Sequence, residues 1–158
     1  FYPVHQNVIW TLLLGLLGIR LMEAARAKGK RWLYILTCAA VVVLGFALGT
    51  LGMVDYYGAG VLTVFAFYFF RERKWWCLLG QLAALYWLNV AVLGGQMYPV
   101  TLFGREIELC EQGLALLALV PIWLYRGRQG HHSKAFQYAC YAFYPAHMLV
   151  LALLTMIQ

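Results

Sequence analysis

Two long runs of uncharged residues constrain this chain most. They extend from Trp32 to Val54 and from Trp75 to Gly104, and neither contains Asp, Glu, Lys or Arg. Each is longer than the roughly 20 residues that an α-helix needs to cross a bilayer core of about 30 Å. The whole chain is 64% hydrophobic and 11% charged, whereas soluble domains carry roughly 25% charged residues. The sequence therefore predicts a polytopic membrane protein.

The apolar segments predict an all-α transmembrane bundle, with residues 1–158 forming one integral-membrane domain. About six transmembrane helices are expected, over residues 7–24, 32–51, 54–70, 75–94, 108–125 and 135–157. The third and fifth are short, because only 15 uncharged residues separate Asp55 from Arg71 and only 14 separate Glu111 from Arg126. At 1.5 Å per residue they reach about 22 and 21 Å. Asp55 and Glu111 must then lie near the membrane edge, or the bilayer must thin there.

Basic residues between the apolar segments predict the orientation. Eleven of the 12 Lys and Arg residues flank the first, third and fifth connections, and such an excess marks cytoplasmic loops. Both ends of this chain are then expected on the outer side. Four tryptophans lie beside the same loops, as an interfacial aromatic belt would require: Trp32, Trp75, Trp76 and Trp123. Because the basic residues are scattered in short loops, the net charge of +6 does not indicate nucleic-acid binding.

Known soluble-enzyme signatures are missing from the sequence. The four cysteines stand singly, so neither a disulfide framework nor a zinc site is indicated. There is no nucleophile elbow, P-loop or dinucleotide fingerprint. Any chemistry must therefore take place among the helices.

A repeated pentapeptide supplies two candidate catalytic histidines. Phe1-Tyr2-Pro3-Val4-His5 returns as Phe143-Tyr144-Pro145-Ala146-His147. An ionisable side chain in hydrocarbon is expensive and usually functional, and a histidine can act as a general base near neutral pH. Asp55 could fix the tautomer of such a base. The alternatives are a His147 that hydrogen-bonds a carbonyl freed by Pro145, an interfacial His5, and an Asp55 that simply starts a helix.

Further polar residues are expected at the outer helix ends and inside the bundle. On the predicted topology six side chains share the outer end and could converge on one pocket: His5, Gln6, Asn7, Asp55, Glu111 and Gln112. Gln81 and Asn89 are predicted to hydrogen-bond a neighbouring helix, with a lining role as the alternative. Gly45 and Gly49 form a small-xxx-small pair that predicts close helix packing.

Four blocks of sequence resemble the TraX family, in the family's order and over almost the whole chain. They are His5-Gln6-Asn7-Val8 leading into Thr11–Gly15, Asp55-Tyr56-Tyr57-Gly58 with Gly60-Val61-Leu62, Gln112–Leu117, and Phe143–His147. The resemblance implies an integral-membrane acetyltransferase of the bacterial cytoplasmic membrane. Its donor would be acetyl-CoA, and its acceptor the N-terminal amine of a pilin or another small membrane-inserted protein. Family members typically carry further N-terminal helices with an Asp-His pair, which nothing in this sequence matches, so we expect that part to be absent.

The resemblance and the residue types together suggest roles for the polar groups. The catalytic candidates are His147, His5 and Asp55. The residues assigned to substrate binding are Asn7, Gln6, Gln112, Glu111 and Tyr144. The residues expected to attract the phosphates of the donor are Arg71, Arg73 and Lys74. The three basic residues are equally explained as topology signals. No metal and no permanently bound cofactor is expected.

Two other classes of protein remain open at this point. One is a small transporter or channel, in which Pro121 and Pro145 would break helices along a substrate path. The other is a non-catalytic membrane subunit that chaperones pilin.

Overall fold

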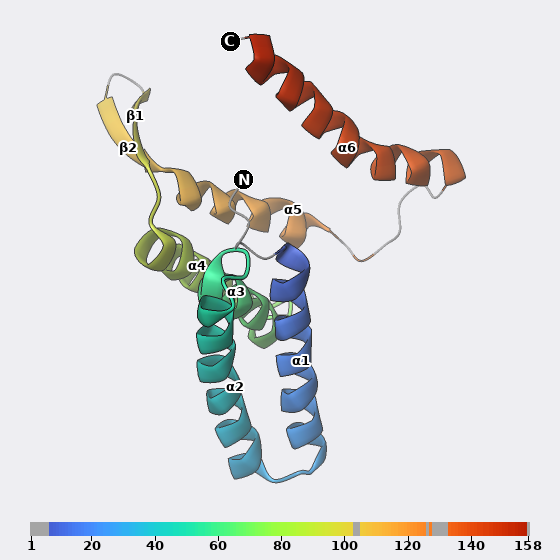
Figure 1. Ribbon diagram of the computed structural model, residues 1–158. Coiled ribbons are helices and arrows are strands. Elements are labelled where there is room, and N and C mark those ends of the chain that lie inside the picture. Colours follow the sequence, from blue (N-terminus) through green and yellow to red (C-terminus); the bar gives the residue numbers. More distant parts are fainter. Residues whose placement is uncertain (1–6, 103–104, 126, 128–132, 158) are drawn as a thin grey trace. The chain divides into compact units, whose positions relative to one another are not determined.

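The computed structural model describes residues 7–102, 105–125, 127 and 133–157, and these are mostly helical (Figure 1). The chain divides into two units, Phe1–Trp123 and Leu124–Gln158. The elements in order are α1 (Val8–Ala27), α2 (Arg31–Leu51), α3 (Tyr57–Phe69), α4 (Trp75–Tyr86), the π-helix η1 (Trp87–Leu93), β1 (Met97–Leu102), β2 (Arg105–Cys110), the 3₁₀-helix η2 (Glu111–Ala118), α5 (Leu119–Leu124) and α6 (Lys134–Ile157).

Four helical stretches within the described residues are long and apolar enough to cross a membrane. They are Val8–Ala27, Arg31–Leu51, Trp75–Leu93 and Lys134–Leu154, whereas Tyr57–Phe69 and Glu111–Leu124 are shorter. The apolar helices agree with the predicted membrane protein. The predicted count of six membrane-crossing helices is not confirmed.

The short helix α3 lies at the centre of the first unit and packs against α1, α2 and α4. Its Val61 and Phe65 are fully buried. Two glycines of α2 allow the close approach: a Cβ on Gly45 would lie 2.7 Å from the Phe65 ring, and one on Gly49 would lie 2.9 Å from the Gly58 Cα. The predicted small-residue packing is therefore confirmed, and α3 is its partner.

The fourth connection contains a β-hairpin that the all-α prediction missed. β1 pairs antiparallel with β2, from Met97 opposite Cys110 to Leu102 opposite Arg105. The predicted helix start at Glu108 is therefore wrong. Residues 106–109 alternate charged and apolar side chains, and this period of two is typical of a strand. The helical segment begins three residues later, at Glu111.

Two helical segments of the first unit depart from α-helical geometry. The 3₁₀-helix η2 rises about 2.0 Å per residue, so its 8 residues reach about 16 Å and the 6 of α5 add about 9 Å. The segment Glu111–Leu124 thus extends about 25 Å, further than an α-helix of the same length. The helix α4 continues without a break into the π-helical turns of η1.

The second unit is built on α6. Ser133 caps this helix, since its Oγ accepts a hydrogen bond from the Phe136 amide at 3.1 Å. Pro145 lies inside the helix. Within the membrane-length window of α6, none of the residues is buried inside the protein.

Candidate functional site

A pocket of about 390 Å³ lies within the first unit, between α1, α3, α4 with η1, and η2 with α5. Its walls are mostly apolar. They are formed by Val8, Leu12, Gly60, Val64, Phe67, Leu85, Leu93, Ala115, Ala118 and Ile122. An apolar pocket with a few polar groups is the usual form of a small-molecule or substrate site.

Five polar side chains also line this pocket: Thr11, Tyr56, Thr63, Asn89 and Gln112. Thr63 Oγ1 donates to the Ala59 carbonyl of its own helix, and Thr11 Oγ1 donates to the Asp55 carbonyl at 2.9 Å. The Asn89 amide donates to the Leu85 carbonyl at 2.9 Å. Among the described residues neither the Asn89 Oδ1 nor the Gln112 side chain has a further hydrogen-bond partner. The pocket therefore offers one free carbonyl oxygen and one complete primary amide.

The two amide-bearing residues sit on the two irregular helices. Asn89 is in the π-helix η1, and Gln112 is in the 3₁₀-helix η2. Short π-helical segments are frequent at functional sites. Irregular backbone at membrane depth is tolerated where it lines a cavity or is buried in protein. Both η1 and η2 line the same pocket, and this coincidence supports a functional role for the pocket.

The turn from α2 to α3 borders the pocket and is strained. Met53, Tyr56 and Tyr57 have φ angles of 48°, 58° and 52°, in the left-handed region that residues other than glycine rarely adopt. Such residues cost on the order of 1–3 kcal/mol each and cluster at functional sites. Thr11 holds this turn through its bond to the Asp55 carbonyl. The strained turn thus places Tyr56 in the pocket wall with Asp55 beside it.

Asp55 does not cap α3, so its interpretation as a helix start is wrong. The N-cap residue is Tyr56, no side chain caps this end, and the first turn of α3 has no acidic residue. Among the described residues, the Asp55 carboxylate has no hydrogen-bond or ion-pair partner. It is half-buried next to the pocket.

The other candidate residues have different surroundings. His5 and Gln6 lie outside the described residues, as does the side chain of Tyr144. Asn7 caps α1, where its Oδ1 accepts from the Ile9 amide at 3.2 Å. Glu111 is exposed at the start of η2, directly before Gln112.

His147 lies on α6, in the second unit of the chain. Its ring is stacked on that of Phe143, with 5.7 Å between the centroids and 4° between the planes. A general base on this helix remains a prediction, as do the catalytic roles of His5 and Asp55.

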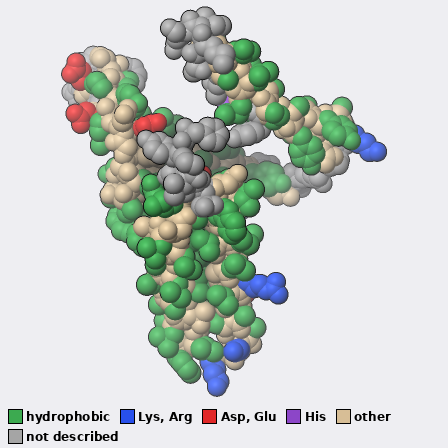
Figure 2. Space-filling model, viewed as in Figure 1, with side chains coloured by type: hydrophobic (Ala, Val, Ile, Leu, Met, Phe, Trp, Pro, Cys, Tyr) green, Lys and Arg blue, Asp and Glu red, His purple; other side chains and the backbone are tan. Residues whose placement is uncertain are grey.

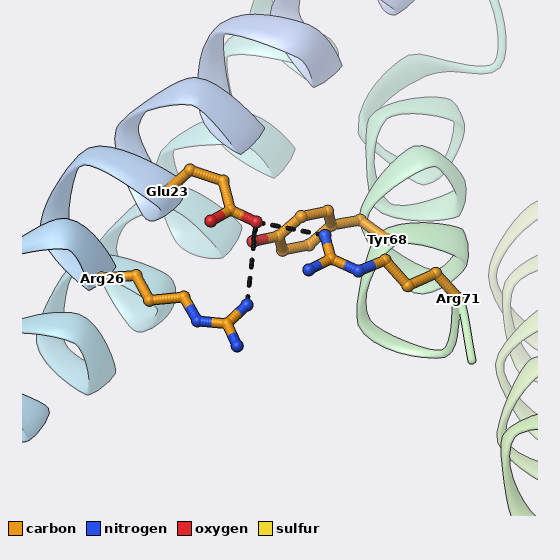
Figure 3. A network of polar contacts seen from close by, with 4 residues as sticks. All are labelled: Glu23, Arg26, Tyr68 and Arg71. Carbon is orange, nitrogen blue, oxygen red and sulfur yellow. Dashed lines mark hydrogen bonds and ion pairs between the residues drawn. The ribbon is translucent and has the colours of Figure 1, made fainter.

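Arg71 belongs to a polar cluster that joins α1 to the end of α3 (Figure 3). The Glu23 carboxylate accepts hydrogen bonds from the Tyr68 hydroxyl at 2.6 Å and from Arg71 at 3.1 Å, and it lies 3.9 Å from Arg26. The bond to Glu23 raises the pKa of the Arg71 guanidinium, which also lies 4.6 Å from the centre of the Tyr68 ring. Arg71 therefore has a structural task.

The remaining predicted phosphate ligands also have intramolecular partners. Arg73 donates to the Trp123 carbonyl at 3.3 Å. Lys74 pairs with Glu72, and its ammonium lies 5.6 Å from the Trp76 ring. Because the 13 residues of α3 rise about 20 Å, Arg71 also lies at the opposite end of this helix from Asp55. A role for these three residues in donor binding remains a prediction that this geometry does not favour.

Basic and acidic side chains gather at different places in the first unit, although Glu23 and Glu72 lie among the basic residues. Figure 2 shows basic side chains around the connection of α1 to α2 and acidic side chains on the β-hairpin. Among the described residues, no group of three or more His, Cys, Asp or Glu side chains could hold a metal ion.

A comparison with protein families identifies the chain. The family model described as TraX protein matches residues 1–155, nearly the whole length. This chain belongs to the TraX family. No curated protein and no solved structure matches it. Membership of the TraX family suggests a function connected with conjugation and pilin.

Sequence reasoning found part of the pocket of this TraX-family chain and missed the rest. Gln112 was among the predicted site residues. Asn89 was predicted mainly to join two helices, but its amide bonds its own helix and it lines the pocket. Gln81 has the predicted joining role, since it donates to the Phe70 carbonyl at 2.9 Å and accepts from the Trp123 indole at 2.7 Å. Thr11 gave no signal, because a threonine in an apolar helix is common.

Proposed function

We propose that the pocket is the acyl-transfer site of an integral-membrane acetyltransferase in the bacterial cytoplasmic membrane. The donor is acetyl-CoA, and the acceptor is the N-terminal amine of a pilin or of another small membrane-inserted protein. Both ends of this chain lie on the outer side in this proposal. The observation that carries it is that, among the described residues, the Asn89 Oδ1 and the Gln112 amide have no hydrogen-bond partner at one apolar pocket of a TraX-family chain.

The reaction needs one hydrogen-bond donor and one acceptor at these positions. The acceptor amine attacks the thioester carbonyl carbon, so a nitrogen–carbon bond forms and the carbon–sulfur bond breaks. The proton lost by the amine ends on the departing CoA thiol. Negative charge builds on the carbonyl oxygen, and in this proposal the Gln112 amide donates a hydrogen bond to it. In this proposal the Asn89 Oδ1 accepts a hydrogen bond from the amine and orients it.

A general base completes this proposal. The base is a histidine, for which the family resemblance offers His147 and His5, and Asp55 is the carboxylate that lies beside the pocket. This part rests on the family resemblance of the Phe143–His147 block and on the unpaired carboxylate of Asp55 beside the pocket.

The apolar walls suit both the donor and the acceptor. Val64, Phe67 and Leu85 give the pocket an apolar wall, which in this proposal disfavours water and so limits hydrolysis of the thioester. They also favour an acceptor whose remaining surface is apolar. A small membrane-inserted protein meets that requirement.

Mass spectrometry of protein N-termini tests the proposal in cells with and without the complete gene. We expect one small membrane protein to lose its acetyl group without the gene. Gln112→Leu should lower the initial rate of acetylation about 10²-fold, because removal of one oxyanion donor costs this much in other acyl transfers. His147→Ala should abolish acetylation.

Gln96→Leu is the matched control, since Gln96 lies outside the pocket and its side chain accepts only from the Tyr98 hydroxyl. It should leave acetylation unchanged. Unchanged acetylation in cells without the gene would exclude the transferase. Full acetylation by a well-expressed Gln112→Leu protein would remove the pocket from the mechanism.

A further inference from the structure

A second, polar pocket of about 220 Å³ lies at the connection of α1 to α2. It is lined by Arg26, Gly29, Lys30, Arg31 and Tyr34. No part of the proposed acetyl transfer uses it. Three of its five lining residues carry a positive charge, and none is acidic.

The local backbone creates this pocket. At the end of α1 the Lys28 amide donates to the Ala25 carbonyl and the Gly29 amide to the Arg26 carbonyl. Gly29 then turns the chain with a φ of 70°, and a Cβ at this residue would meet nothing within 4 Å. Lys30 is extended and is the N-cap residue before α2, which begins at Arg31. The short connection thus brings Arg26, in the last turn of α1, next to Arg31, in the first turn of α2.

The positive charge of the pocket is poorly balanced. Glu23 is the nearest acidic residue in sequence, and the next one along the chain is Asp55. Glu23 lies 3.9 Å from Arg26 but is bonded at 3.1 Å to Arg71. Among the described residues, Lys30 and Arg31 have no acidic partner.

The start of α2 adds to this charge. The first backbone amides of a helix have no acceptor within it and carry a partial positive charge. At α2 no side chain caps these amides, and the first turn contains no acidic residue. Arg31 and Lys30 therefore sit at the end of a helix where an anion is favoured and a cation is not.

We propose that this pocket binds a phosphate-bearing group. Its volume is about seven times the roughly 30 Å³ that a water molecule occupies, which is room for a phosphate or diphosphate. Arg31 and Arg26 offer planar guanidinium groups that match phosphate oxygens, and Lys30 adds a third positive charge. The group comes either from an anionic phospholipid or from a soluble phosphorylated molecule such as a coenzyme. This proposal stands independently of the acetyl transfer.

Calorimetry on the full-length protein, purified in an uncharged detergent, tests the site with inorganic pyrophosphate and with coenzyme A as probes. Arg31→Gln should weaken binding at least about tenfold, because a hydrogen bond to a charged group contributes this much. Arg20→Gln is the matched control, since Arg20 is exposed on α1, lies outside the pocket and carries the same charge. It should bind both probes as the wild type does.

A parallel measurement distinguishes the two sources. Phosphatidylglycerol retained through purification is quantified by mass spectrometry for the wild type and both variants. Binding of pyrophosphate and coenzyme A that depends on Arg31 assigns the site to a soluble ligand. Retention of phosphatidylglycerol that depends on Arg31, without binding of the soluble probes, assigns it to a lipid. The proposal is overturned if the wild type binds none of the three, or if both variants lose binding equally.

Discussion

Helices α2 and α3 approach closely at Gly49, and Gly49→Ala tests whether this close approach holds the first unit together. The added Cβ would lie 2.9 Å from the Gly58 Cα and 3.0 Å from the Tyr57 carbonyl oxygen, both in the backbone of α3. Neither atom can rotate away. An ordinary separation of 3.4–4 Å therefore requires the two helices to move apart by roughly 0.5–1 Å.

The cost follows from the weaker dispersion attraction across the widened interface. A gap of this size forfeits a quarter or more of the attraction between each pair of atoms, and a large buried side chain has on the order of 50 such pairs at roughly 0.15 kcal/mol each. For Val61 and Phe65 the loss is about 4 kcal/mol if all their neighbours belong to α2, and about 2 kcal/mol if half do. Alanine returns up to about 1 kcal/mol through its higher helix propensity. We expect a net destabilisation of about 1–3 kcal/mol, the usual range for overpacking.

Cys77 provides the assay because it is fully buried, with 0% of its surface exposed. In a protein whose other cysteines are alanine, a maleimide reacts with Cys77 only when the unit opens. Gly49→Ala should raise the labelling rate in detergent about 5–150-fold.

Gly113→Ala is the matched control, since its Cβ would meet neighbours at 3.7 and 3.8 Å, which is ordinary van der Waals contact. It should label no faster than the parent protein. Equal labelling rates for the two variants would refute the reasoning from helix packing.

Three further predictions use the same protein. Gln81→Leu removes the hydrogen bonds that join α4 to α3 and α5, and should cost about 1 kcal/mol, read as roughly fivefold faster Cys77 labelling. The hydrogen bond from Lys74 lowers the pKa of Glu72 below its ordinary value of 4.5. The pair therefore stabilises the fold at pH values above 4.5, and this stabilisation is lost as the pH falls through the lowered pKa. In the Lys74→Gln variant, the midpoint of thermal unfolding should therefore decrease less on acidification than it does in the wild type. Ala115→Phe places a ring in the main pocket and should abolish acetylation, whereas Leu117→Phe, on the same helix but outside this pocket, should not.

Much of the fold could be predicted because hydrophobic length and charge are local properties of the sequence. The observed helices begin and end within a few residues of the predicted ones except at the fourth connection. The pair Gly45 and Gly49 also indicated a close helix approach correctly, although the sequence could not name α3 as the partner. The hairpin was missed because Glu106 and Glu108 were interpreted as loop charges rather than as alternate positions of a strand.

The pocket was less predictable because it depends on helix geometry that composition does not encode. Gln112 was found through its position at a helix end. Asn89 was not assigned to the site, because its direction depends on the π-helical turns of η1, and a shift from 3.6 residues per turn has no simple sequence signal. The strain at Tyr56 likewise appears only in backbone angles.

The arrangement of polar and apolar groups along α3 restricts what the pocket can hold. The pocket follows this helix from Tyr56 to Phe67, about 16 Å, with Asn89 and Gln112 among its polar groups. Thr11 and Tyr56 place polar atoms at the Asp55 end, and from Val64 onward the α3 wall is apolar. A ligand that fills this pocket therefore meets polar atoms near Tyr56 and apolar side chains near Phe67. This lining favours an amphiphilic molecule with its polar end near Tyr56 and its apolar portion along α3.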